Sequence, residues 1–214
     1  MDGSRPLNPR VPRSVGLVDL SADAADGAAE LLLADLAEAM RAYDRLGHAG
    51  EAGYEPLAVM RMEPEGVGEV DSLVVALGEG ADVPALDGLA LAAGQRVYGL
   101  GVFAGDVPGG ASTFGSLAAA CVAVGAVWCG VLVVPRADLV ARFASGPRMG
   151  LFRRGVSEAM DDLIVAIRSG IAVGEAGKDT LQARLPRVAR LLAGWRTRHG
   201  SSGIQRAARL RPAD

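Results

Sequence analysis

Five short apolar runs constrain the fold of this chain more than any other feature of its sequence. Three of them are close to continuously apolar instead of alternating between apolar and polar residues, which is typical of strands covered by helices on both faces. Such strands form parallel sheets, in which crossover helices join one strand to the next. In chain order the runs are SVGLVDL from Ser14, YEPLAVMRM from Tyr54, DSLVVALG from Asp71, RVYGLGVFAG from Arg96 and AVWCGVLVVP from Ala126.

Segments with helical spacing separate these runs. The first covers residues 24–46, and its apolar positions at that spacing are Ala28, Leu32, Leu36, Ala39, Met40 and Tyr43. Shorter helices are predicted over residues 84–93 and 112–124, and another begins near Val156. The alternation predicts right-handed βαβ units and an α/β fold, a doubly wound parallel sheet of five strands in the order 2-1-3-4-5.

The composition of the two ends differs from that of the middle. Residues 1–13 are polar and proline-rich and predict a flexible arm, residues 14–174 predict the α/β domain, and residues 175–214 predict a C-terminal helical tail. Within the tail, residues 180–199 predict a helix whose apolar stripe is Leu181, Leu185, Val188, Leu192 and Trp195. Either this helix packs on its own or a neighbouring subunit, or its arginines form a basic surface for an acidic partner.

Charge and cysteine content narrow the possible partners. The formal net charge is −3 and the pI is near 5.5, so no general basic field favours nucleic acid or an anionic membrane. Cys121 and Cys129 both lie in apolar runs and are interpreted as buried thiols. The polar leader does not resemble a secretory signal and no run has the length of a membrane span. We therefore expect a cytoplasmic protein that binds neither nucleic acid nor membrane.

Open α/β sheets bind ligands outside the carboxyl ends of their strands, near the point where strand order reverses. In this chain the relevant loops follow the first, third and fourth runs, and they read SADAADG, GEGADVP and AGDVPGGAST. The last of these is rich in glycine, which lets backbone amides approach a planar ligand closely. These loops are the predicted ligand site.

The arrangement of these elements resembles the flavodoxin-like fold, and in particular the NAD(P)H-dependent FMN reductase family, over about residues 14–170. Pro84 stands where such reductases often carry a proline that opens the next helix, and the fourth strand ends in Gly109 and Gly110. The tail from Leu185 is similar to C-terminal extensions in this family, with Trp195 as its anchor. The resemblance implies bound FMN, with NAD(P)H as the reductant and a quinone, a flavin or another small molecule as the acceptor. The implied cofactor-binding residues are Ser21, Ala22, Asp23, Gly78, Glu79, Gly105, Asp106, Gly109 and Gly110. No catalytic side chain is implied, because the flavin carries the chemistry.

Two departures from the family pattern support a different hypothesis. Asp23 and Asp26 stand in the first loop, where the FMN phosphate would lie, and the third-strand loop has Glu79 in place of an aromatic residue that would stack on the flavin. If Asp23 caps the first helix and Asp26 lies in its first turn, the chain supplies its own anion there. The alternative is a flavin-free member that binds another small ligand or a partner. The expected assembly is a homo-oligomer or a complex with a flavin-binding paralogue.

Other chemistries find less support in the sequence. His48 and His199 are far apart and no Cys or His cluster accompanies either, which argues against a metal site. Ser21 lacks the flanking glycines of a hydrolase nucleophile. Arg153 and Arg154 either contact solvent or a neighbouring subunit, or reach a phosphate or a dinucleotide across the cleft.

Overall fold

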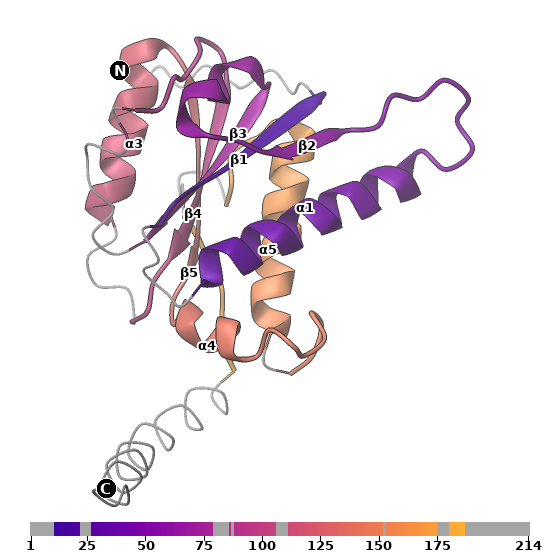
Figure 1. Cartoon of the computed structure of the whole chain (residues 1–214), viewed down its shortest axis with the longest axis vertical. Coiled ribbons are helices and arrows are strands. Elements are labelled where there is room, and N and C mark those ends of the chain that lie inside the picture. The colour runs from indigo at the N-terminus through magenta and orange to yellow at the C-terminus, as the bar shows by residue number, and fades with distance from the viewer. Residues whose placement is uncertain are drawn as a thin grey trace, which may run out of the picture.

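A computed structural model describes residues 11–21, 27–78, 86, 88–105, 111–151, 153–174 and 180–186, with only the backbone described at 111–113. Its centre is one parallel sheet in the order β2-β1-β3-β4-β5-β6 (Figure 1). The strands are β1 (Ser14–Leu20), β2 (Ala58–Arg61), β3 (Ser72–Gly78), β4 (Arg96–Val102), β5 (Val127–Val134) and β6 (Thr180–Gln182). The order of the first five strands is the flavodoxin-like order that the sequence predicts.

Helices cover both faces of this sheet. One face packs against α1 (Ala28–Gly47), α4 (Ala137–Arg142) and α5 (Arg154–Ser169). The other face packs against α3 (Ala111–Val124) and the 3-10 helix η1 (Pro64–Glu69). Figure 1 shows α3 on one side of the strands and α1 and α5 on the other. The fold is therefore doubly wound, as predicted.

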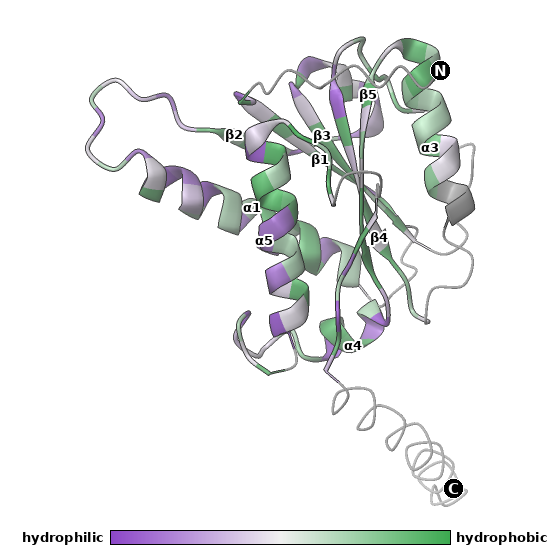
Figure 2. Ribbon diagram, turned by 180° about the vertical axis from the view of Figure 1, so that it is seen from behind, coloured by the Kyte–Doolittle hydropathy of each residue, from purple (hydrophilic) through white to green (hydrophobic). Residues whose placement is uncertain are grey.

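Burial of apolar side chains explains this layering. Every residue of β3 is buried, as expected for a strand enclosed between two helical layers. In α1 the side chains of Leu32, Leu33, Leu36 and Met40 are at most 1% exposed. Figure 2 shows hydrophobic residues concentrated in the central strands, whereas α1 and α5 carry both hydrophobic and hydrophilic residues. These two helices are amphipathic and bury their apolar sides on the sheet.

The sixth strand corrects one prediction. Residues 180–182 form β6 beside Val131–Val133 of β5, where the sequence predicts the start of a helix. The amide N–H of Ala183 also donates to the carbonyl of Val133 (2.9 Å), so pairing with the free edge of β5 outweighs the helical periodicity of this short segment. The remainder of the predicted helix lies mostly outside the described residues. The division into residues 1–13, 14–174 and 175–214 stays a prediction.

Two helix boundaries also differ from the predictions. The helix predicted over residues 84–93 does not extend past residue 88, because the N–H of Ala90 donates to the carbonyl of Pro64 (3.1 Å) instead of continuing a helical ladder. The helix predicted from residue 24 begins only at Ala28, since Gly27 has a left-handed backbone (φ 78°). The short helix α4 was not predicted.

Candidate functional site

The strand order reverses at β1, so the carboxyl ends of β1 and β3 border the crevice in which doubly wound folds bind ligands. Leu20 of β1 lies opposite Leu77 of β3, so the next residues, Ser21 and Gly78, lie at the carboxyl ends of these two strands. Gly105 follows β4, the adjacent strand on the side away from β1. The structure thus places three of the sequence-predicted residues at one edge of the sheet, which we call the carboxyl edge.

Six other residues that the resemblance implies fall outside the described residues, and their assignment stays a prediction. They are Ala22, Asp23, Glu79, Asp106, Gly109 and Gly110.

The end of β1 carries a carboxylate that the sequence analysis did not single out. Ser21 is only 4% exposed, and its backbone N–H donates to Oδ1 of Asp19 (2.9 Å). Asp19 itself is exposed, so its negative charge lies next to the crevice. A charged residue at the end of an otherwise apolar strand is the signal that could have identified it.

The start of α1 contradicts the capping interpretation of the first loop. The N-cap is Gly27, no side chain caps this helix end, and the acidic residue of the first turn is Glu30. The carboxylate of Glu30 accepts a hydrogen bond from Nη2 of Arg61 (2.6 Å). The described helix thus has Gly27 at the position predicted for Asp23 and Glu30 as its first-turn carboxylate. Asp23 and Asp26 themselves lie outside the described residues.

Aromatic side chains near the end of β4 are used in packing. An added Cβ on Gly101 would lie 2.8 Å from Cε2 of Phe103 and 2.9 Å from Cζ of Phe114. The two phenyl rings make an edge-to-face contact with centroids 6.3 Å apart. Both are buried, at 3% and 6% exposure. Neither ring offers a free face on which a flavin could stack.

Arg136 is a second residue of the carboxyl edge that the sequence analysis missed. It follows β5 and is the one non-glycine residue with a positive φ (52°) in the described part of the chain. Its N–H donates to the carbonyl of Gly105 (3.1 Å), which ties it to the predicted glycine-rich loop. Its Nε lies 3.6 Å from Oδ1 of Asp138. A positive charge therefore lies at the same edge as Asp19, next to a carboxylate of its own.

Arg153 fits neither of its two interpretations, whereas Arg154 is exposed, as the first of them expects. Arg153 is 4% exposed, forms an ion pair with Asp35 of α1, and donates to the carbonyls of Ala144 (3.1 Å) and Gly146 (3.2 Å). Arg154 is exposed and pairs with Glu158 (2.7 Å). Arg153 thus holds the segment before α5 against α1, and neither arginine is a free phosphate ligand.

Thiol and metal chemistry find no site in the described residues. Cys121 and Cys129 are free and buried, as predicted, and burial raises the pKa of each thiol to about 11, so neither is a reactive thiolate at neutral pH. Within the described ranges no group of three or more His, Cys, Asp or Glu side chains could hold a metal ion. Of the described helices, none combines the length and apolar character needed to cross a membrane.

Comparisons with known proteins add little to this geometry. No protein-family model matches the sequence, and no curated protein matches it. Among solved structures, the chain is similar to a flavodoxin from Streptococcus pneumonia TIGR4 at a TM-score of 0.37 and 17% identity, over 62% of this chain and 94% of that one. The flavodoxin-like description of the fold therefore rests on the strand order of the sheet itself.

Proposed function

We propose that this chain is a flavodoxin-fold oxidoreductase whose carboxyl edge binds the ring system of FMN. The observation that supports this most is the reversal of strand order at β1, with Ser21, Gly78 and Gly105 at the carboxyl edge. Serine hydroxyl groups and glycine backbone suit the polar edge of a planar ring, because they approach it closely without a bulky side chain in between.

Bound FMN would accept hydride from NAD(P)H and pass electrons to a quinone, a flavin or another small acceptor. The protein's contribution would be to hold and orient the ring through Ser21 and through the backbone at Gly78 and Gly105. No acid or base side chain is required at this edge for such a role.

The residues fit the ring of FMN better than they fit its phosphate. Asp19 places one carboxylate at the end of β1, and the first loop adds Asp23 and Asp26 in the sequence. At about 6 Å and an effective dielectric constant of about 20, each pair of like unit charges costs about 1–3 kcal/mol before screening. The proposed site therefore favours a flavin without a phosphate over FMN itself.

A second candidate function is a flavin-free protein that binds another small ligand or a partner, such as a second copy of this chain or a flavin-binding paralogue. The buried pair Phe103 and Phe114 favours it, since these rings are unavailable for stacking. The same fold serves both functions, so the site must decide between them.

The visible spectrum of the purified protein tests the first proposal. We expect flavin absorbance after addition of FMN or riboflavin and gel filtration, with more riboflavin than FMN retained. Retained flavin that NADPH or NADH bleaches under anaerobic conditions supports the oxidoreductase. If neither flavin is retained at high micromolar concentration, the flavin-free function replaces it.

A further inference from the structure

Cavities of ligand size lie at the opposite edge of the sheet, near the amino ends of the strands. Two adjoining cavities of about 530 and 480 Å³ share Val11, His48 and Arg168 in their walls. We call them together the amino-edge groove. Each has the size of a small-molecule pocket, for which about 300–1,000 Å³ is usual. The groove lies between the last turns of α1 and α5, far along the strands from the carboxyl edge.

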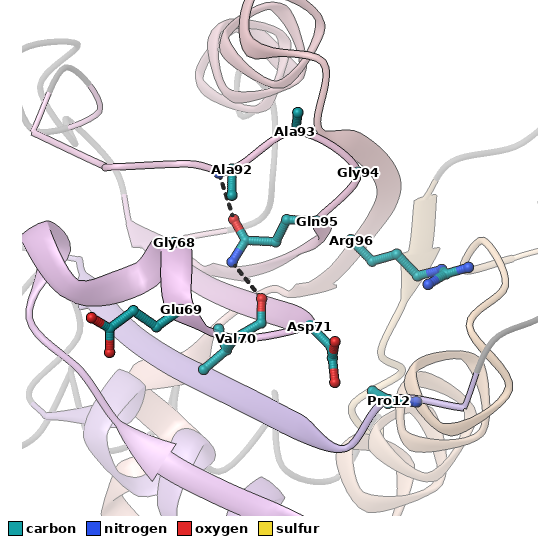
Figure 3. Close-up of a pocket in the computed structure, with 10 residues that line it drawn as sticks. All are labelled: Pro12, Gly68, Glu69, Val70, Asp71, Ala92, Ala93, Gly94, Gln95 and Arg96. Atoms are coloured by element: carbon teal, nitrogen blue, oxygen red, sulfur yellow. Dashed lines mark hydrogen bonds between the residues drawn. The ribbon is translucent and has the colours of Figure 1, made fainter.

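A smaller cavity of about 270 Å³ lies at the same edge, and its polar groups are bonded within the protein (Figure 3). There the amide of Gln95 donates to the carbonyl of Val70 (2.9 Å) and accepts from the N–H of Ala92 (3.3 Å). The carboxylate of Asp71 accepts from the N–H of Arg13 (2.8 Å). These polar groups already have partners within the protein, so they leave little for a ligand to bind.

The amino-edge groove has apolar and aromatic side chains that are exposed to solvent. Val11, Tyr43 and Val165 line it and are 74%, 39% and 58% exposed. The ring of His48 stacks on that of Tyr54, with centroids 3.8 Å apart and an interplanar angle of 14°. A ligand with a flat apolar body would cover this surface and displace water from it.

The carboxylates of the groove are mostly engaged with protein donors. Asp44 is 5% exposed, accepts from the hydroxyl of Tyr54, and accepts from the N–H of Leu57 (2.9 Å). Asp161 raises the pKa of Tyr43 through its charge and a hydrogen bond, so the two side chains are partners. Glu55 lines the groove too, but it is exposed to solvent.

Arg168 differs from these acids. It is half-buried and lines both cavities, and an added Cβ on Gly47 would lie 3.3 Å from its Nη2. Its guanidinium group therefore reaches from α5 to the end of α1. In the described part of the chain it makes no side-chain hydrogen bond or ion pair, although its charge acts on Tyr54.

Arg168 lies in the last turn of α5, where a positive charge stabilises the helix, but this effect is small. Cations stabilise a helix carboxyl end modestly, by about 0.3–1 kcal/mol. The final carbonyls of α5 already accept backbone hydrogen bonds, since Gly170 donates to Ile167 (3.1 Å) and Ile171 donates to Ala166 (3.0 Å). Within the described residues, the five guanidinium donors of Arg168 thus have no acceptor and are available to a ligand.

We propose that the amino-edge groove binds a small organic anion with a flat apolar body, such as an aryl carboxylate. The anionic group would pair with the guanidinium of Arg168, where two parallel hydrogen bonds suit a carboxylate. The apolar body would lie against Tyr43, Val165 and the stacked rings of His48 and Tyr54. This site does not depend on the proposed flavin site at the other edge.

The test uses the full chain and a matched pair of probes, 2-naphthoate and its neutral analogue 2-naphthamide, measured by calorimetry and by NMR shifts. We expect naphthoate to bind at least tenfold more tightly than naphthamide. Arg168→Gln should abolish this preference. Arg154→Gln, an exposed arginine at the other end of α5, should leave it unchanged.

A second variant keeps the test independent of Arg168. Val165→Glu adds a negative charge on an exposed wall of the groove and should also weaken naphthoate at least tenfold, while the thermal unfolding temperature stays close to that of the wild type. Equal binding of the two probes, no binding at millimolar concentration, or binding that survives Arg168→Gln would each overturn the proposal. Saturating riboflavin should not compete with naphthoate, and competition would move the naphthoate site to the carboxyl edge.

Discussion

The two edges of the sheet use charge in different ways. At the carboxyl edge the described charged side chains mostly have partners: Asp35 pairs with Arg153, and Asp19 accepts a backbone hydrogen bond. At the amino edge Arg168 lines two cavities and has no such partner among the described residues. Chain topology therefore predicts where loops converge. A cavity lined by an unpaired charged side chain instead depends on how side chains from separate helices pack together.

The largest expected effect comes from breaking the buried ion pair near the carboxyl edge. Arg153→Met leaves the carbonyls of Ala144 and Gly146 without their side-chain donor and leaves Asp35 with Arg148, 4.0 Å away, as its ion-pair partner. Removing one partner of a buried pair costs about 3–5 kcal/mol, and the neighbouring Arg148 puts the expected loss at the lower end of this range. Urea unfolding should show this loss of stability.

The matched control is Arg154→Met, which removes an exposed pair with Glu158 and should leave the stability close to that of the wild type, because solvent screens such pairs. If the two variants have similar stability, the carboxyl edge is not held by its charges, and the contrast between the edges fails.

The second prediction concerns flavin selectivity at the carboxyl edge. Asp23→Asn combined with Asp26→Asn should tighten FMN binding by about one or two powers of ten for each aspartate that lies near the phosphate. Asp19→Asn is a gentler probe, because its amide oxygen can still accept from the N–H of Ser21.

Riboflavin is the control ligand, since it lacks the phosphate and its affinity should hardly change. The gain for FMN should also shrink at high salt, as screening weakens interactions between exposed charges. Tight FMN binding by the wild type that worsens in the double variant would show that these aspartates point away from the phosphate.

The third prediction tests how the chain beyond β6 docks. An added Cβ on Gly155 would lie 1.9 Å from the carbonyl oxygen of Arg184, so Gly155→Ala should displace the segment that buries Ala183 and Leu185. Overpacking of this kind costs about 1–3 kcal/mol. Hydrogen exchange should rise at residues 180–185.

Gly115→Ala is the control, because nothing lies within 4 Å of the added Cβ on this exposed face of α3. It should be neutral or stabilise the protein by up to about 1 kcal/mol, as alanine favours a helix over glycine. Unchanged exchange near β6 in Gly155→Ala would mean that the helix shifts instead of the strand.

Much of the fold was predictable because it depends on local patterns. Four of the apolar runs became β1, β3, β4 and β5, and the run from Tyr54 contains the shorter β2. By contrast, β6 has only three residues and is stabilised by distant pairing with β5, for which no local signal exists. The helix predicted from residue 24 begins only at Ala28, because Gly27 has a left-handed backbone that apolar spacing does not reveal.

The residues of the two candidate sites also differ in whether the sequence could predict them. Ser21, Gly78 and Gly105 could be predicted because parallel strands all end at the same edge. Arg136 could not, since its relation to Gly105 depends on a hydrogen bond between two separate strands' ends. The amino-edge groove was equally hidden, because His48, Tyr54 and Arg168 meet only after α1 and α5 pack side by side.

The smallest expected effect isolates the backbone of Arg136 at the carboxyl edge. Arg136→Gly and Arg136→Ala both remove the guanidinium that lies 3.6 Å from Asp138, so they differ only in how readily the backbone adopts φ 52°. The left-handed conformation costs non-glycine residues about 1–2 kcal/mol, and we expect the glycine variant to be more stable by about 1 kcal/mol.

At Arg45, an exposed position within α1, the order should reverse, because alanine stabilises a right-handed helix over glycine by about 1 kcal/mol. Chemical unfolding of the four variants measures both differences. Should alanine be equal or better at both positions, the left-handed turn after β5 is not a source of strain, and Arg136 would need no functional reason to occupy it.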